Sequence, residues 1–117
     1  MSENQWQKRV FVAKPAAVWN NEGARLHDLK RYDEALAAIE RALTFDPNDA
    51  EIWTNQGSAL YGLERYDEAL AAHERALTLD PKFALAWKNK AYPLRALGRT
   101  AEAEAAERRA KELGASQ

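Results

Sequence analysis

The sequence repeats itself every 34 residues, and this period constrains the fold more than any other feature of the chain. Tryptophan returns at that interval as Trp19, Trp53 and Trp87. The eight residues 31–38 return unchanged at 65–72. A fixed period of this length indicates a stack of repeats rather than one globular core. Such stacks seldom carry out chemistry and instead present a curved surface to another chain.

Composition narrows the classes of function. The 117 residues predict one domain. A net charge of -1 lacks the strongly basic footprint of a nucleic-acid binder. The absence of cysteine excludes disulfides and thiolate chemistry. No apolar run is long enough for a membrane span, and residues 1–15 lack the apolar centre of a signal peptide. We therefore expect a soluble, cytoplasmic protein that binds neither nucleic acid nor a membrane.

Each period predicts two helices. In the second period two apolar stripes with helical spacing flank a turn at Glu64 and Arg65. Asp80-Pro81 ends the second helix, because the residue before a proline is pushed out of helical geometry. Asn48 or Asp49 is expected to cap the helix that follows. The first helices are predicted at 17–30, 50–63 and 84–97, and the second helices at 33–45, 67–79 and 101–113.

Small residues recur inside these helices. Gly23 and Gly57 lie in the middle of first helices, with Ala91 in their place in the third period. A glycine there costs about 1 kcal/mol relative to alanine, which is tolerable where a neighbouring helix must come close. Ala35, Ala69 and Ala103 are the expected contacts on the second helices.

Taken with Leu60, Ala76 and Pro81, these residues resemble the tetratricopeptide repeat (TPR) family. The resemblance covers three repeats, 16–49, 50–83 and 84–117, with residues 1–15 as a short N-terminal extension. It implies an all-α fold, a superhelical stack of three antiparallel helix-turn-helix repeats. The chain departs from the family where the second helix has an aromatic residue, since Ile39, His73 and Glu107 stand there.

The resemblance implies a protein-interaction module that binds a peptide or a partner helix in a concave groove lined by the first helices, without a cofactor or a metal. The second helices of repeats one and two differ only at Ile39/His73 and Phe45/Leu79, whereas the first helices vary, as on a binding surface. The alternative is drift among ordinary solvated residues. The groove residues implied are Asn20, Asn21, Ala24, His27, Glu51, Thr54, Asn55, Ser58, Tyr61, Lys88, Asn89, Tyr92 and Arg95.

Charge and hydrogen bonding suggest how this groove would hold a peptide. Asn21, Asn55 and Asn89 recur at one repeat position, and an asparagine offers both a donor and an acceptor to a peptide backbone. Lys88 and Arg95 make one end of the groove basic. The other end is expected to be acidic through Asp28, Asp49 and Glu51.

One subtype of the family captures chaperone C-terminal carboxylates with a Lys, Asn, Asn, Lys and Arg clamp. Only Asn55 fits that clamp, so we do not expect this ligand. The other four positions hold Asn20, Ala24, Leu85 and Asn89.

An enzymatic function is not indicated. His27 and His73 are expected on different helix faces without a metal-ligand partner, and His73 is expected to be packed in an interface. No glycine-rich phosphate loop or paired-carboxylate site stands out. Helical-hairpin RNA-binding proteins have a similar architecture, but the charge balance argues against strong phosphate binding.

The third repeat departs from the pattern in two ways. Glu104, Glu107 and Lys111 replace the apolar residues of the earlier second helices, which predicts that 101–113 form a polar C-terminal cap. Pro93 predicts a kink or an early end in a first helix. Its presence reflects either weak constraint on a terminal repeat or a kink that turns Tyr92 and Arg95 toward a ligand.

Residues 1–15 leave three hypotheses open. The segment is basic and contains Trp6 and residues 10–12, Val-Phe-Val. It forms a helix capping repeat one, or is the remnant of a longer array, or occupies a groove as a peptide mimic. Two alternatives to peptide binding follow. The chain is a self-assembling module that forms homo-oligomers through this segment or the first repeat, or it is a consensus-like scaffold without an evolved ligand.

Overall fold

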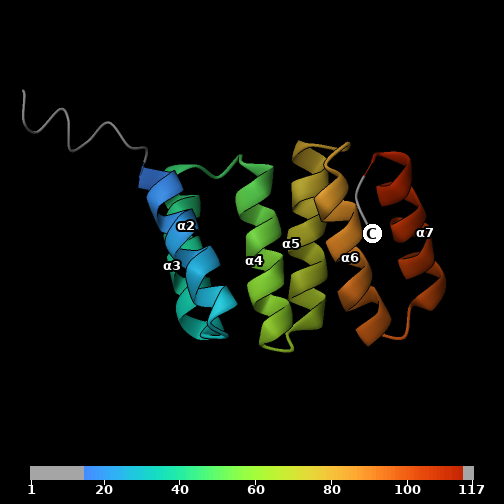
Figure 1. The fold of residues 1–117 in the computed structure, drawn as a ribbon, viewed down its shortest axis with the longest axis horizontal. Helices are drawn as coiled ribbons and strands as arrows, with labels where there is room; N and C mark the ends of the chain where they lie inside the picture. The colour runs from blue at the N-terminus through green and yellow to red at the C-terminus, as the bar shows by residue number, and fades with distance from the viewer. Residues whose placement is uncertain (1–14, 115–117) are drawn as a thin grey trace, which may run out of the picture.

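A computed structural model of the chain describes residues 15–114, which form six α-helices and no strand. The helices pair as antiparallel hairpins and stand in a row in chain order (Figure 1). The predicted all-α stack of three repeats is confirmed, with helix bounds within two residues of those expected. The hypotheses on the N-terminal segment concern residues outside the described range, except that Pro15 begins the first helix. The helices are α2 (Pro15–Asp28), α3 (Tyr32–Phe45), α4 (Ala50–Gly62), α5 (Tyr66–Leu79), α6 (Ala84–Ala96) and α7 (Thr100–Glu112).

The turn inside each hairpin has the same backbone geometry in every repeat. Lys30 and Glu64 have φ of 61°, and Gly98 has φ of 78°. The residue after each of them donates its backbone N–H to the carbonyl five residues earlier, as Arg65 does to Leu60 at 2.9 Å. This left-handed ending satisfies a carbonyl that the helix leaves free. The sequence located the turn but not its left-handed residue.

The turn between repeats is held by a cap and by the recurring tryptophan. The Asp49 carboxylate accepts hydrogen bonds from the backbone N–H groups of Glu51 and Ile52, so of the two expected caps Asp49 is the one used. The indole of Trp53 donates to the carbonyl of Pro47 at 2.7 Å. Trp87 donates to Pro81 at 2.9 Å in the next repeat. Trp53 and Trp87 thus tie their helices to the preceding turns.

Small residues let the two helices of a repeat approach closely, as predicted, but the nearest side chains are Ile39 and His73 and not the alanines expected as contacts. A Cβ added at Gly57 would lie only 2.5 Å from Cε1 of His73, and one added at Gly23 would clash with Ile39 in the same way. Ala91 is tolerated in repeat three because the matching residue, Glu107, leaves the interface and pairs with Arg95 at the surface. The change from glycine to alanine therefore accompanies the loss of a bulky partner.

Each repeat packs only on its neighbours. Leu70 packs with Ala91 and Leu94, and Leu77 packs with Ala86, so the apolar stripe of α5 is buried against repeat three as predicted. Glu104 and Lys111, at the equivalent places of α7, are exposed. Within residues 15–114 no helix is long and apolar enough to cross a membrane.

Pro93 does not end its helix early. Helix α6 continues past it to Ala96, so the prediction of an early end is wrong, whereas a kink stays a prediction. The proline lies in the last turns of the helix, where its missing N–H removes one backbone bond. Its ring is fully buried at the position that Ala59 occupies in repeat two, so packing favours it there.

Candidate binding groove

Helices α2, α4 and α6 line one side of the stack, and two adjoining pockets open there. The larger, called here the tyrosine pocket, has a volume of about 260 Å³ and is lined by His27, Ser58, Tyr61, His73, Asn89 and Tyr92. The small pocket has a volume of about 120 Å³ and is lined by Ala24, His27, Asp28, Ile39, Asn55 and Ser58. His27 and Ser58 belong to both, so the pockets form one continuous groove.

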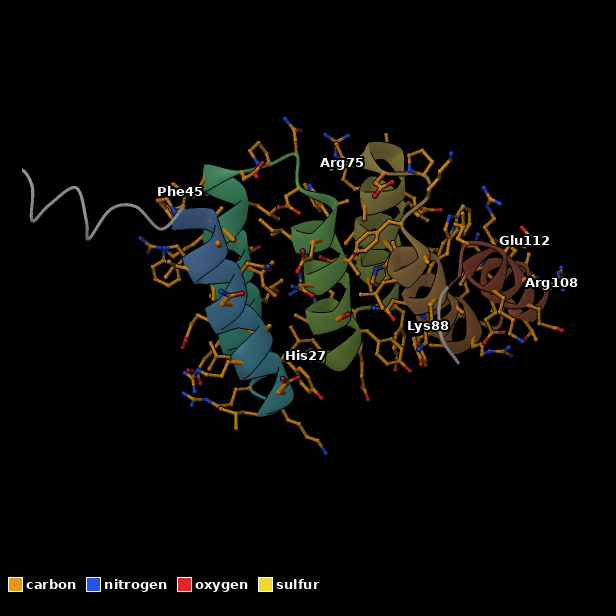
Figure 2. All side chains as sticks on the ribbon, turned by 45° about the horizontal axis from the view of Figure 1, so that its top comes forward. His27, Phe45, Arg75, Lys88, Arg108 and Glu112 are labelled. Carbon is orange, nitrogen blue, oxygen red and sulfur yellow. The ribbon has the colours of Figure 1, made fainter. Side chains whose placement is uncertain are left out.

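The groove is concave because residues of repeats one and three meet in it. His27 comes from α2, whereas Asn89 and Tyr92 come from α6, yet all three line the tyrosine pocket. Within the described residues, the helices of these two repeats do not contact each other directly. Figure 2 shows His27 near the lower end of α2, facing α4, with Lys88 farther along the row on α6.

Aromatic rings form the walls of the tyrosine pocket. The rings of Tyr61 and Tyr92 have centroids 5.9 Å apart and are tilted by 52°. The ring centroid of Tyr66 lies 5.4 Å from that of Tyr61, and the ring centroid of Tyr32 lies 5.3 Å from that of His27. Tyr61 and Tyr92 are among the exposed large side chains of the molecule, so their ring faces are available to a ligand.

The floors of the two pockets come from one repeat position on the second helices. Ile39 closes the small pocket and His73 closes the tyrosine pocket. His73 is only 1% exposed, which confirms that it is a packed residue, and its Nδ1 is buried without a hydrogen-bond partner. Burial, with a smaller contribution from the positive charge of Lys90, lowers the pKa of His73 to about 4. The imidazole is therefore neutral at pH 7.

Seven of the thirteen predicted groove residues line these pockets. They are Ala24, His27, Asn55, Ser58, Tyr61, Asn89 and Tyr92.

The other predicted residues lie elsewhere. Asn20 and Thr54 are buried. Asn20 accepts a hydrogen bond from the Asn55 amide at 2.8 Å, and the Thr54 hydroxyl donates to the carbonyl of Ala50 at 2.9 Å. Asn21 is exposed outside both pockets and Lys88 is half-buried beside them. Of the predicted ladder, Asn21 is exposed, Asn55 lines the small pocket and Asn89 lines the tyrosine pocket, so the three asparagines have different surroundings.

The residues expected to charge the two ends of the groove do not all lie in it. Arg95 pairs with Glu107, so the guanidinium at the basic end is already engaged. At the other end Asp28 lines the small pocket. Asp49 and Glu51 instead line a separate acidic hollow at the turns between repeats, together with Asp46 and Asp80.

His27 on α2 and His73 on α5 line the same pocket, although they come from different helices. They belong to repeats one and two, which pack directly on each other. In the part of the chain that the structure describes, no group of three or more His, Cys, Asp or Glu side chains is placed to hold a metal ion. The role of His73 as the floor of a pocket was not predicted. The available signal was the Ile39/His73 difference between two nearly identical helices.

Comparison with known families agrees with this architecture. A profile described as "Tetratricopeptide repeat" matches residues 50–83, the second predicted repeat. A second, described as "TPR repeat", matches residues 23–63. The comparison with curated proteins found no match.

Solved structures of similar fold cover most of the chain. The first TPR of Spaghetti (RPAP3), bound to an HSP90 peptide, has a TM-score of 0.83 at 24% identity, covering 88% of this chain and 82% of that one. The TPR2B domain of yeast Sti1, in a complex with pHsp70, has a TM-score of 0.83 at 26% identity, with coverage of 88% and 82%. The Arabidopsis OM64 TPR domain has a TM-score of 0.82 at 22% identity, with coverage of 86% and 83%.

Proposed function

Because the chain belongs to the tetratricopeptide repeat family, whose domains are protein-interaction modules, we propose that it binds an extended peptide segment of a partner protein along the groove. The proposal assigns the chain no catalytic activity, cofactor or metal. The binding domain would comprise residues 16–117.

The observation that carries this proposal is the pair of adjoining pockets. At about 120 and 260 Å³ they lie below the roughly 300–1,000 Å³ of sites for drug-sized ligands. Each has room for one side chain. In an extended peptide, residues i and i+2 point to the same side, so a single strand can fill two neighbouring pockets. A peptide with two side chains directed at the groove therefore fits this geometry.

The similarity to a Sti1 domain in a pHsp70 complex supports a peptide ligand, but its particular ligand is not transferred. Four of the five positions of the carboxylate clamp are changed in this chain. Asn20, at the first of them, is buried and engaged with Asn55. We therefore propose a peptide held by side-chain pockets and not by its terminal carboxylate.

The test is selection of random peptides against the purified chain, followed by titration of the best peptide. Tyr92→Ala and Lys88→Ala should weaken binding, because Tyr92 forms a groove wall and Lys88 lies beside it. Phe45→Ala is a matched control. Phe45 is 54% exposed against 50% for Tyr92, and it lies at the end of the repeat-one hairpin opposite His27 (Figure 2). Peptides whose affinity ignores Tyr92→Ala, or responds equally to Phe45→Ala, would rule out groove binding.

One observation favours self-association as a second candidate. Val18 on α2 is 53% exposed within residues 15–114, whereas its equivalents Ile52 and Ala86 are 2% and 0% exposed against a preceding helix. A second copy could cover this face. Light scattering at increasing concentration should then show oligomers that Val18→Glu removes. A chain that stays monomeric throughout would exclude this candidate.

A further inference from the structure

We propose that the tyrosine pocket selects a tyrosine side chain of the bound peptide, and prefers it to phenylalanine because the phenol hydroxyl pairs with His73 at the floor. This inference rests on the proposed function and specifies the ligand of the same groove.

The walls of the pocket select an aromatic ring. The rings of Tyr61 and Tyr92 pack against each other at a tilt, with centroids 5.9 Å apart, and so form one aromatic wall on which a ligand ring can pack. Aromatic pairs favour such tilted and edge-to-face arrangements, which add to the gain from burial. A volume of about 260 Å³ has room for one planar side chain, and the neighbouring small pocket has less than half of that volume.

The floor selects a hydroxyl at the tip of that ring. His73 lines the pocket, is almost fully buried, and has a buried Nδ1 without a partner. Buried polar atoms in native proteins nearly always have a partner, in the protein or as an ordered water, so an unpaired one at the floor of a pocket leaves a position that a ligand group can fill. A neutral imidazole carries one donor and one acceptor nitrogen, and a phenol hydroxyl can both donate and accept. Tyrosine can therefore pair with either tautomer of His73, whereas phenylalanine cannot.

The small pocket provides an internal comparison. Its floor is Ile39, at the same repeat position and against the equivalent glycine, Gly23. An apolar floor offers no hydrogen bond, so the preference for a hydroxyl should be confined to the tyrosine pocket. His73→Ile copies the repeat-one floor into repeat two, and its counterpart shows that isoleucine packs against a glycine in this fold.

The experiment titrates the isotope-labelled full chain with N-acetyl-tyrosinamide and, separately, N-acetyl-phenylalaninamide, following backbone amide shifts by NMR. Both probes should shift Ser58, Tyr61, Asn89 and Tyr92. One added hydrogen bond predicts that the tyrosine probe binds roughly threefold to tenfold more tightly. In His73→Ile the two probes should bind with equal affinity, and the affinity of the phenylalanine probe should be the same as for the unaltered chain.

Further variants keep the result interpretable. Tyr92→Ala, at the surface, should weaken the binding of both probes without changing the melting temperature. Phe45→Ala should leave the affinity of both probes unchanged. Melting of His73→Ile by circular dichroism verifies that it is folded. Equal affinities in the unaltered chain, a tyrosine preference that survives His73→Ile, or shifts outside the pocket would each overturn the inference.

The proposed function and the inference can fail separately. Library peptides that bind through the groove without any enrichment of tyrosine would refute the inference and leave the proposed function intact. Preferential binding of N-acetyl-tyrosinamide with no peptide recovered from the library would support the pocket and count against the proposed function.

Discussion

His73 couples the stability of the fold to pH. Its pKa falls from about 6.5, the ordinary value, to about 4 in the folded chain, because burial disfavours the charged imidazole. Between these two values the unfolded chain binds a proton that the folded chain does not. The free energy of unfolding should therefore have its full value above about pH 6.5 and should decline as the pH falls toward 4. A shift of this size corresponds to roughly 3 kcal/mol.

Urea unfolding at a series of pH values from 7.5 to 4 checks this prediction. His73→Ile is the control, because isoleucine does not titrate and stands at the same position in repeat one. Acidic residues also titrate in this range, so the informative quantity is the difference between the two chains. If both lose stability in parallel, His73 is not the titrating group.

Gly57 should be intolerant of even one methyl group. An added Cβ would lie 2.5–2.7 Å from three atoms of the His73 ring. Overpacking costs about 1–3 kcal/mol, against about 1 kcal/mol gained from the better helix propensity of alanine. Gly57→Ala should therefore destabilise the chain by up to about 2 kcal/mol in a urea titration.

A double-mutant cycle identifies the cause of this loss. In a His73→Ala background the clash is gone, so Gly57→Ala should be neutral or stabilising. Ala91→Gly in repeat three should instead destabilise by about 1 kcal/mol, because Glu107 leaves room for the methyl group. If Gly57→Ala destabilises the chain by the same amount in the His73→Ala background, the contact between residue 57 and His73 is not the cause.

At the scale of the helices, the sequence predicts the bounds well because their signals are local. Asp49 caps α4, and prolines follow α3 and α5. The left-handed turn residues were not predicted, because Lys30 and Glu64 are not glycines and only the geometry of the hairpin requires their φ. Lateral packing likewise decides that Pro93 lies inside α6.

The groove was predicted only in part, for a similar reason. Asn20, Thr54 and Lys88 share one repeat position, and the family pattern treats them alike. The two short side chains are buried and satisfied within the stack, whereas the long lysine is half-buried. Helical spacing gives the face on which a side chain starts, but side-chain length and the neighbouring helix decide whether it reaches the groove.

The hairpin turns give a prediction at this scale. A non-glycine residue in the left-handed region is strained by about 1–2 kcal/mol. Repeat three avoids the strain with Gly98, where repeat two has Glu64 at φ of 61°. Glu64→Gly should raise the free energy of unfolding by about 0.5–1 kcal/mol, since the greater freedom of glycine in the unfolded chain offsets part of the gain.

Thermal and urea unfolding of Glu64→Gly, beside Glu64→Ala, separate backbone strain from the loss of a charge. The alanine variant removes the same carboxylate but keeps a Cβ at the strained position. If both variants are stabilised to the same extent, the effect comes from the lost charge, and the predicted backbone strain at Glu64 is contradicted.

For the whole molecule, the faces at the two ends of the row matter most, because each repeat packs only on its neighbours. Leu70 and Leu77 of α5 are buried by repeat three, whereas Glu104 and Lys111 of α7 are exposed at the equivalent places. Arg108 and Glu112 also extend from α7 at the far end of the stack (Figure 2). Charged side chains on such a face would have to lose their water if another repeat packed there. We therefore predict that α7 acts as a polar cap that prevents copies from stacking end to end.

Replacing the three charged residues with those of repeat one tests this prediction. In an Ala91→Gly background, which leaves room for an isoleucine at position 107, Glu104→Leu, Glu107→Ile and Lys111→Leu together recreate the stripe of Leu36, Ile39 and Leu43, which packs against α4 in this chain. The triple variant should self-associate in sedimentation experiments at micromolar concentration. The same three positions changed to glutamine remove the charges without supplying an apolar stripe, so that chain should stay monomeric. If both variants associate, the effect is due to the loss of charge repulsion. If the apolar variant stays monomeric, the polar face of α7 is not what prevents end-to-end stacking.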